Sequence, residues 1–310
     1  MARLAPVFLL VLGLSALFSS HIAPFDPDAQ SLGDVLIPPR GSDSQGRLHL
    51  LGTDFLGRDV FSRLIYGSRV SLAMAATVVL VSCVIGAGLG LVAGYSGGRV
   101  DSIAMRFADV QLALPFMLIA IAVMAALGPG LDKMILVLIL VTWAIYARIA
   151  RGQVLAAKEL DFVLAARSLG ASTPRILVKH VFPNILGALI VVATLETAQM
   201  VVAEAALSYL GLGVRPPTAS WGSMLADGRN YLYTSWWLST FPGMAIFLTV
   251  LSINVLGAEL RERMDPRLRR WKGATGLGGQ ARDGGRLVQS ERPLQGTAAA
   301  RVRTVGGNGG

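Results

Sequence analysis

Two glutamates and a glutamine inside one long apolar segment are the first candidates for chemistry: Glu196, Gln199 and Glu204. Glu196 and Glu204 are eight residues apart, which puts them about 80° apart around a helix and on one broad face. A carboxylate in a membrane is costly, so such residues usually face a bundle interior or a wet cavity. We therefore predict that the three residues line a translocation path or its gate. The alternative is that they join neighbouring helices through hydrogen bonds.

Patterns typical of catalytic or metal sites are missing from the sequence. It contains no CxxC and no HExxH, and its three histidines (His21, His49 and His180) lie in polar stretches. The single cysteine, Cys83, lies in an apolar run and has no second cysteine to pair with. The phosphate-binding pattern GxxxxGK[ST] is absent, and no Gly-Lys pair occurs anywhere. We predict that the chain is not an enzyme, binds no metal or cofactor, and does not hydrolyse ATP itself.

The elements that must position these residues are membrane helices. Hydrophobic residues make up 53% of the chain and charged residues 15%, against roughly 25% charged residues in soluble proteins. Apolar runs alternate with short polar ones, which is the membrane pattern. We predict an all-α membrane protein with six transmembrane helices, at residues 4–19, 70–93, 110–127, 134–147, 185–210 and 236–257. The first run could instead be a cleaved signal peptide. The fourth run is either a short span or a tilted one, with Arg148 snorkelling in both cases.

The basic residues predict the orientation. Six of them lie between residues 148 and 179, and eleven from residue 261 onward. With the N-terminus inside, the inner segments hold 20 of the 28 basic residues, so the positive-inside rule puts both termini in the cytoplasm. We predict three regions. Residues 1–68 form a first helix and an extracytoplasmic segment, residues 69–260 form a five-helix transmembrane domain with a cytoplasmic loop at 151–184, and residues 261–310 form a basic tail that is disordered from about residue 273.

A charged cluster lies in the predicted extracytoplasmic segment, in the stretch LGTDFLGRDVF. Asp54, Arg58 and Asp59 could form a rim against which an outer protein docks. The alternative is local: Thr53 or Asp54 caps a helix that begins near Phe55, and the neighbouring charges bond within the turn.

Glycines form a strip in the second apolar run, at Gly86, Gly88, Gly90 and Gly94. Small residues at this spacing let two membrane helices approach closely. We predict that the strip packs against helices of this chain, with a seam between two subunits as the alternative.

A polar stretch in the cytoplasmic loop, residues 161–184, has the composition of two short helices joined at a glycine. Gly170 can end the first helix in a left-handed conformation. Ser172 or Thr173 can then cap the second helix, with Pro174 in its first turn. A short helix with small residues on one face suits the groove of another protein. The alternative is a loop helix that lies on lipid headgroups.

The spacing in this hairpin resembles the signature loop of ABC-importer membrane subunits. That signature begins with an acidic residue and two alanines, has a glycine four residues later, and a proline about thirteen residues after that. The matching residues are Leu164, Ala165, Ala166, Gly170 and Pro183, and Leu164 stands where the family has the acidic residue. The resemblance implies that this loop couples the chain to an ATPase subunit. It leaves open which contact the change at Leu164 alters.

Longer stretches, at residues 51–72, 204–229 and 236–269, resemble the C-type permease subunits of dipeptide, oligopeptide and nickel ABC importers. The resemblance implies a type I importer permease fold in a bacterial cytoplasmic membrane. It implies a second permease, two cytoplasmic ATPases that use ATP and Mg²⁺, and an extracytoplasmic solute-binding protein that docks on the outer rim. The cargo would be a peptide or a similar small solute such as nickel, glutathione or an opine. A carrier driven by an ion gradient is the alternative, but it leaves the cytoplasmic hairpin unexplained.

Overall fold

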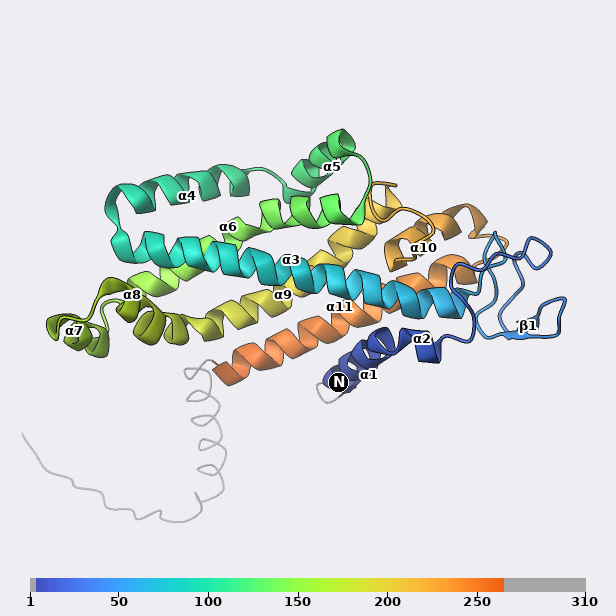
Figure 1. The fold of residues 1–310 in the computed structure, drawn as a ribbon, viewed down its shortest axis with the longest axis horizontal. Coiled ribbons are helices and arrows are strands. Elements are labelled where there is room, and N and C mark those ends of the chain that lie inside the picture. Colours follow the sequence, from blue (N-terminus) through green and yellow to red (C-terminus); the bar gives the residue numbers. More distant parts are fainter. Residues whose placement is uncertain (1–3, 265–310) are drawn as a thin grey trace, which may run out of the picture. The chain divides into compact units, whose positions relative to one another are not determined.

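The structure is a computed structural model that describes residues 4–264. The basic tail after residue 264, and with it the disorder predicted from about residue 273, lies outside the described residues. Four long helices, α3, α6, α9 and α11, run side by side through most of the described chain (Figure 1). The elements are, in order, α1 (Leu4–Leu17), α2 (Ser19–Ile22), β1 (Gly41–Ser42), β2 (Leu48–His49), α3 (Val60–Ser96), α4 (Gly98–Ala113), α5 (Phe116–Leu127), α6 (Leu131–Ala157), α7 (Asp161–Ser168), α8 (Thr173–Ile176), a π-helical turn (Leu177–Val181), α9 (Phe182–Tyr209), α10 (Trp221–Gly228), a 3₁₀ turn (Arg229–Tyr231) and α11 (Trp237–Met264).

Membrane-spanning helices account for most of the described chain. Four helices are long and apolar enough to cross a bilayer: Val60–Ser96, Leu131–Ala157, Thr173–Tyr209 and Trp237–Met264. The bent pair α4–α5 would make a fifth. At 1.5 Å per residue, α1 is about 21 Å long, shorter than the roughly 30 Å of a hydrocarbon core. The all-α membrane class is confirmed, with four to five such helices among residues 4–264.

Pro115 breaks the run predicted as a single span at residues 110–127. A proline has no N–H to donate and pushes the residue before it out of the helical region. Leu114 is extended, with φ −97° and ψ 139°, and α4 meets α5 at 86°. Figure 1 shows the two helices as separate limbs beside α3 and α6. The prediction of one continuous helix here was wrong.

Two of the other predicted spans begin or end in the wrong place. Helix α3 starts at Val60, ten residues before the apolar run, and it passes through the boundary expected at residue 68. Helix α6 continues to Ala157, well past Arg148. Arg148 and Arg151 are accommodated because they pair with Asp109 and Asp101 on α4. Helix α6 is therefore not a short span.

The glycine strip packs against α6 of the same chain. A Cβ atom at Gly86 would collide with the backbone oxygen of Trp143, and one at Gly90 with that of Ala147. Gly88, on the opposite side, has open space around it. Because the glycines remove this steric obstacle, α3 and α6 form the most extensive helix contact in the described chain. The prediction of an intrachain seam is confirmed.

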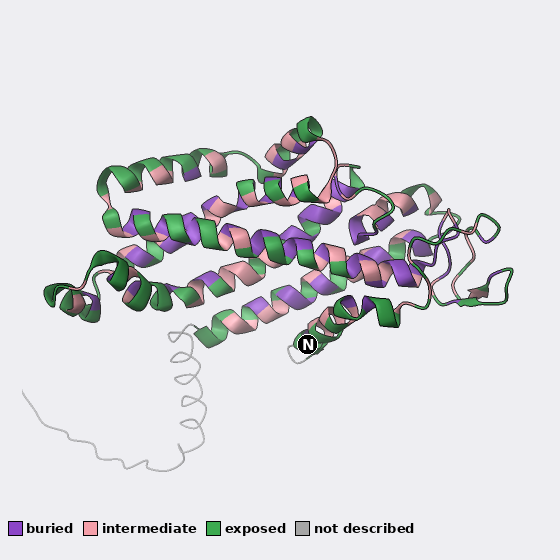
Figure 2. Cartoon of the chain, in the orientation of Figure 1, coloured by how far each residue is buried: buried purple, intermediate pink, exposed green. Residues whose placement is uncertain are grey.

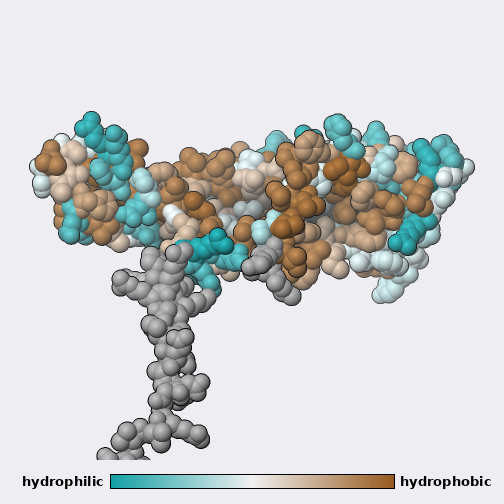
Figure 3. Space-filling model, turned by 90° about the horizontal axis from the view of Figure 1, so that it is seen from below, coloured by the Kyte–Doolittle hydropathy of each residue, from teal (hydrophilic) through white to brown (hydrophobic). Residues whose placement is uncertain are grey.

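Buried residues lie where the helices face one another, and exposed residues lie on the outside of the bundle (Figure 2). Buried residues lie on the facing sides of α3, α6 and α9, whereas α4 has only Ala108 buried (Figure 2). Apolar side chains cover the middle of the surface in Figure 3, and hydrophilic residues gather towards its two ends. This pattern suits a bilayer around the middle and water at both ends.

Candidate functional sites

The outer segment, residues 23–59, is a largely irregular chain held by hydrogen bonds. Its only ladder among the described residues is the two-residue pair β1 and β2. The Asp34 carboxylate accepts hydrogen bonds from the Ser31 hydroxyl at 2.6 Å and the Ser44 backbone N–H at 2.8 Å. These two bonds, the Ser31 bond first, hold the pKa of Asp34 below its usual value. The segment thus has a defined shape despite its lack of regular structure.

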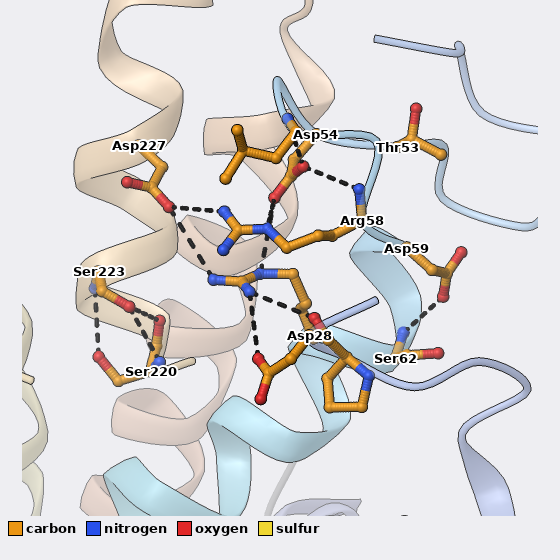
Figure 4. Close-up of polar contacts among 12 residues, drawn as sticks. Asp28, Thr53, Asp54, Arg58, Asp59, Ser62, Ser220, Ser223 and Asp227 are labelled. Carbon is orange, nitrogen blue, oxygen red and sulfur yellow. Dashed lines mark hydrogen bonds and ion pairs between the residues drawn. The ribbon is translucent and has the colours of Figure 1, made fainter. Parts of the chain in front are cut away.

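A charged network joins this segment to α3 and α10 (Figure 4). The Arg58 Nε lies 2.6 Å from Asp54 Oδ2. Arg63, on the first turn of α3, lies 3.7 Å from the same carboxylate and 3.8 Å from Asp28. Asp227, on α10, lies 3.5 Å from Arg58 and 3.9 Å from Arg63. Burial raises the pKa of the Asp227 carboxyl, against the opposing effect of the two guanidinium groups.

Asp59 caps α3. Its Oδ2 accepts a hydrogen bond from the Ser62 backbone N–H at 2.7 Å, while its Oδ1 lies 2.8 Å from Nδ1 of His49. The helix therefore begins at Val60 and not near Phe55, because Asp59 provides the cap and residues 54–58 form a turn.

Asp54, Arg58 and Asp59 are 5%, 3% and 2% exposed. These three side chains are too buried for a docking protein to contact them directly. Such a protein would contact the surface of the segment that they hold in shape. The geometry matches the local alternative, a helix cap and turn framework. The Asp54 carboxylate also accepts hydrogen bonds from the backbone N–H groups of Leu56 and Arg58.

The hairpin at residues 161–184 lies at the end of the bundle opposite to the segment at residues 23–59 (Figure 1). Only one of its two arms, α7, is a separate short helix. Helix α7 ends before Gly170, which has a φ of +79° and where an added Cβ atom would meet nothing within 4 Å. The expected left-handed conformation is confirmed. Ser172 occupies the cap position of the next helix with Pro174 in its first turn, although its side chain makes no capping bond.

The second arm is not a separate short helix. Residues Thr173–Tyr209 form one run, in which α8 continues through a π-helical turn into α9. Pro183 does not interrupt this run because it lies in the first turn of α9. The second arm of the hairpin is thus the first part of a helix long enough to span a membrane, in contrast to the two short helices expected from the sequence.

Apolar side chains are exposed on the hairpin, whose helices α7 and α8 lie together at one end of the bundle (Figure 1). Leu164, at the position that is acidic in the signature loop, is 42% exposed, and Leu169 is 88% exposed. Ala165 is also exposed, and Ala166 is half-buried. The hairpin therefore offers small and apolar groups at an end of the bundle where most of the surface is polar.

A cavity lies near the middle of the bundle, beside the break at Pro115. Its volume is about 210 Å³. Its lining residues come from α4, α5, α6 and α9: Leu112, Phe116, Val141, Thr142, Ile145, Glu196, Gln199 and Met200. Two of the three predicted path residues, Glu196 and Gln199, therefore share one cavity.

Glu204 lies apart from that cavity and is completely buried. The hydroxyls of Ser71 and Ser208 donate hydrogen bonds to its carboxylate, each at 2.8 Å. The Ser71 oxygen also lies 3.4 Å from the Trp221 backbone N–H, at the start of α10. This arrangement joins α3, α9 and α10, which matches the alternative of hydrogen bonds between helices.

Several residues of these sites escaped the sequence analysis. Asp227 is 169 positions from Arg58, and no local pattern connects the two. Arg63 gave a weak signal, as a second arginine five residues after Arg58 at the start of an apolar run. Thr142 gave none, because a single threonine in an apolar helix is common.

Comparisons with known proteins agree on one family. The family model described as "Binding-protein-dependent transport system inner membrane component" matches residues 86–270. The chain is 43% identical over 263 residues to the di/tripeptide transport system permease protein DppC of Pseudomonas aeruginosa, covering 85% of this chain and 87% of that protein. It is 40% identical over 266 residues to the nickel transport system permease protein NikC of Escherichia coli, covering 86% and 94%.

A solved structure shares the fold. A chain of the inward-facing MetNI methionine ABC transporter matches with a TM-score of 0.54 and 18% sequence identity, over 66% of this chain and 97% of that chain. At this level of identity the likeness concerns the fold alone.

Proposed function

The chain belongs to the family of binding-protein-dependent transport system inner membrane components, and from this membership we propose that it carries peptides or a similar small solute across the membrane. It is a permease subunit of an ABC importer. The names of its relatives include di- and tripeptides and nickel as cargo. Glutathione and opines are the other cargoes proposed.

We propose that the chain crosses the membrane six times, with both termini in the cytoplasm. Helices α1 and α2 together cover residues 4–22, or about 28 Å of helix, which supports a first crossing. The bent pair α4–α5 would be the third. The basic residues of the hairpin and of the tail support the orientation.

The hairpin at residues 161–184 is proposed to couple the chain to an ATPase subunit. The observation that carries this proposal is the exposed apolar surface of the hairpin, above all Leu169, on the side of the bundle where basic residues gather. A groove on a cytoplasmic partner would bury this surface, as amphipathic helices are buried in grooves elsewhere. ATP and Mg²⁺ would be used by two such partners, since the chain has no phosphate-binding loop.

The remaining partners are a second, related permease and an extracytoplasmic solute-binding protein. The outer segment, braced by the Asp54–Arg58 pair, supplies a shaped surface for the binding protein. Glu196 and Gln199, in the cavity, are the proposed path residues. Glu204 is proposed to hold the outer ends of α3, α9 and α10 in place beside that path.

Copurification tests the assembly. The chain would be tagged, extracted in mild detergent, and its retained partners identified by mass spectrometry. We expect a second permease and ATPase subunits with phosphate-binding loops, in comparable amounts. If the chain runs alone, or only with copies of itself, even after crosslinking, the coupling proposal is wrong and a gradient-driven carrier becomes the better explanation.

A further inference from the structure

The two glutamates of α9 have opposite surroundings. Glu204 is fully buried and accepts two hydrogen bonds. Glu196 is half-buried, lines the cavity, and has no hydrogen-bond or ion-pair partner among residues 4–264. A carboxylate in the middle of a membrane span is costly unless something pairs with it. The described chain supplies that partner for Glu204 but not for Glu196.

The cavity around Glu196 is suited to a small cationic group. Apolar side chains form most of its wall, while Gln199 and Thr142 add an amide and a hydroxyl. Among the lining residues within 4–264, Glu196 is the only ionisable one. In so apolar a setting the attraction between a carboxylate and a cation is much stronger than in water.

A second polar group without a partner lies close by. The Tyr146 hydroxyl is completely buried and has no hydrogen-bond partner in the described part of the chain. Along α6 it directly follows Ile145, which lines the cavity. Buried polar groups rarely stay unpaired unless they serve a purpose. The unpaired Glu196 carboxylate in the cavity therefore marks it as a place where a polar ligand is received for part of a cycle.

The cargoes of the relatives indicate which chemical group the ligand carries. The names of these relatives include di- and tripeptides and nickel. A dipeptide at neutral pH carries an ammonium group, and nickel is a divalent cation, so the common feature is positive charge.

We propose that Glu196, with Gln199 and Thr142 beside it, makes a transient contact with a cationic group of the cargo as it passes the middle of the membrane. This inference rests on the proposed import function. The contact must be strong enough to admit the cation and weak enough to release it. A single carboxylate beside two neutral polar groups meets both requirements.

Uptake by the whole importer tests the proposal. The assembly retained by the tagged chain would be placed in proteoliposomes with ATP, Mg²⁺ and excess cargo-loaded binding protein. Radiolabelled dialanine and radioactive Ni²⁺ would be supplied in separate experiments. Uptake by the wild-type importer then shows whether its cargo is a peptide with an ammonium group or a metal cation. Glu196→Gln removes the charge and keeps the shape, whereas Glu196→Asp keeps the charge. Thr197→Val is the matched control, since Thr197 is the next residue but does not line the cavity.

At equal amounts of assembled complex, we expect Glu196→Gln to lower initial uptake about tenfold, Glu196→Asp less than about threefold, and Thr197→Val less than about twofold. The inference is overturned if Glu196→Gln transports like the wild type, or if Glu196→Asp is as impaired as Glu196→Gln. Failure of the wild type to import either cargo would instead overturn the proposed function as an importer of dipeptides or nickel.

Discussion

Replacing Leu169 with alanine should weaken the contact proposed between the hairpin and an ATPase while leaving this chain intact. Leu169 is 88% exposed, so its side chain contributes little to packing within the described chain. Substitutions at such positions usually change stability by less than about 0.5 kcal/mol.

The size of the effect follows from the exposed fraction. Burying a leucine side chain completely is worth about 1.5–3 kcal/mol. Nearly all of that surface is free in the isolated subunit, so a groove that covers Leu169 should gain about 2 kcal/mol from it. Alanine would lose most of this gain, which corresponds to about a thirtyfold weaker Kd.

The assay is a titration of purified ATPase onto the permease pair in nanodiscs, with binding followed by fluorescence anisotropy. Leu32→Ala is the matched control, because Leu32 is 77% exposed but lies in the outer segment. We expect a weaker Kd for Leu169→Ala only, with a parallel fall in ATP-driven uptake. An unchanged Kd for Leu169→Ala at normal protein stability would show that the ATPase does not cover this residue.

Four further predictions test other parts of the molecule. Arg58→Ala removes the closest cationic partner of the buried Asp54 carboxylate and should lower stability by about 1.5–3 kcal/mol, seen as less protein in the membrane; normal protein with poor uptake would favour a docking role. Gly90→Ala should lower the unfolding temperature of the solubilised protein by forcing α3 from α6, whereas Gly88→Ala should not. Glu204→Gln should cost about 1–3 kcal/mol of stability and leave uptake per folded molecule unchanged; altered cargo selectivity would return Glu204 to the path. The lowered pKa of Asp34 means that its contribution to stability is present above about pH 4 and is lost as the pH falls through that lowered value. Proteolysis of the outer segment should therefore rise as the pH is lowered below about 4, and rise less in Asp34→Asn.

Much of the fold could be predicted because hydropathy reports where a chain is apolar. It does not report where a helix begins or in which direction it continues. The first ten residues of α3 are too polar to count as a span, yet they are helical because Asp59 caps them and Arg63 pairs with carboxylates of the outer segment. Residues 110–127 are apolar apart from Gln111, yet Pro115 turns the chain by 86° within them.

The sites could be predicted only as far as their residues lie close together in the sequence. Asp54, Arg58 and Asp59 are neighbours, so their cluster was visible, but their burial and their link to Asp227 depend on tertiary structure. Glu196 and Glu204 share one helix, and the sequence assigned them the same role. The neighbouring helices separate them, because α3 presents Ser71 to Glu204 while the break at Pro115 leaves a cavity beside Glu196.

One continuous helix connects the proposed coupling element with both glutamates. Thr173–Tyr209 is 37 residues long, or about 55 Å of helix. It begins in the hairpin, carries Glu196 past the cavity, and ends near the Glu204 cluster. A displacement of the hairpin by an ATPase would therefore reach Glu196 through backbone hydrogen bonds and need no intervening loop. The π-helical turn at Leu177–Val181 is the irregular point in that run, and such turns often mark functional sites. The Glu204 cluster fixes the far end against α3 and α10, so movement of the hairpin would be taken up between these two points, where the cavity lies.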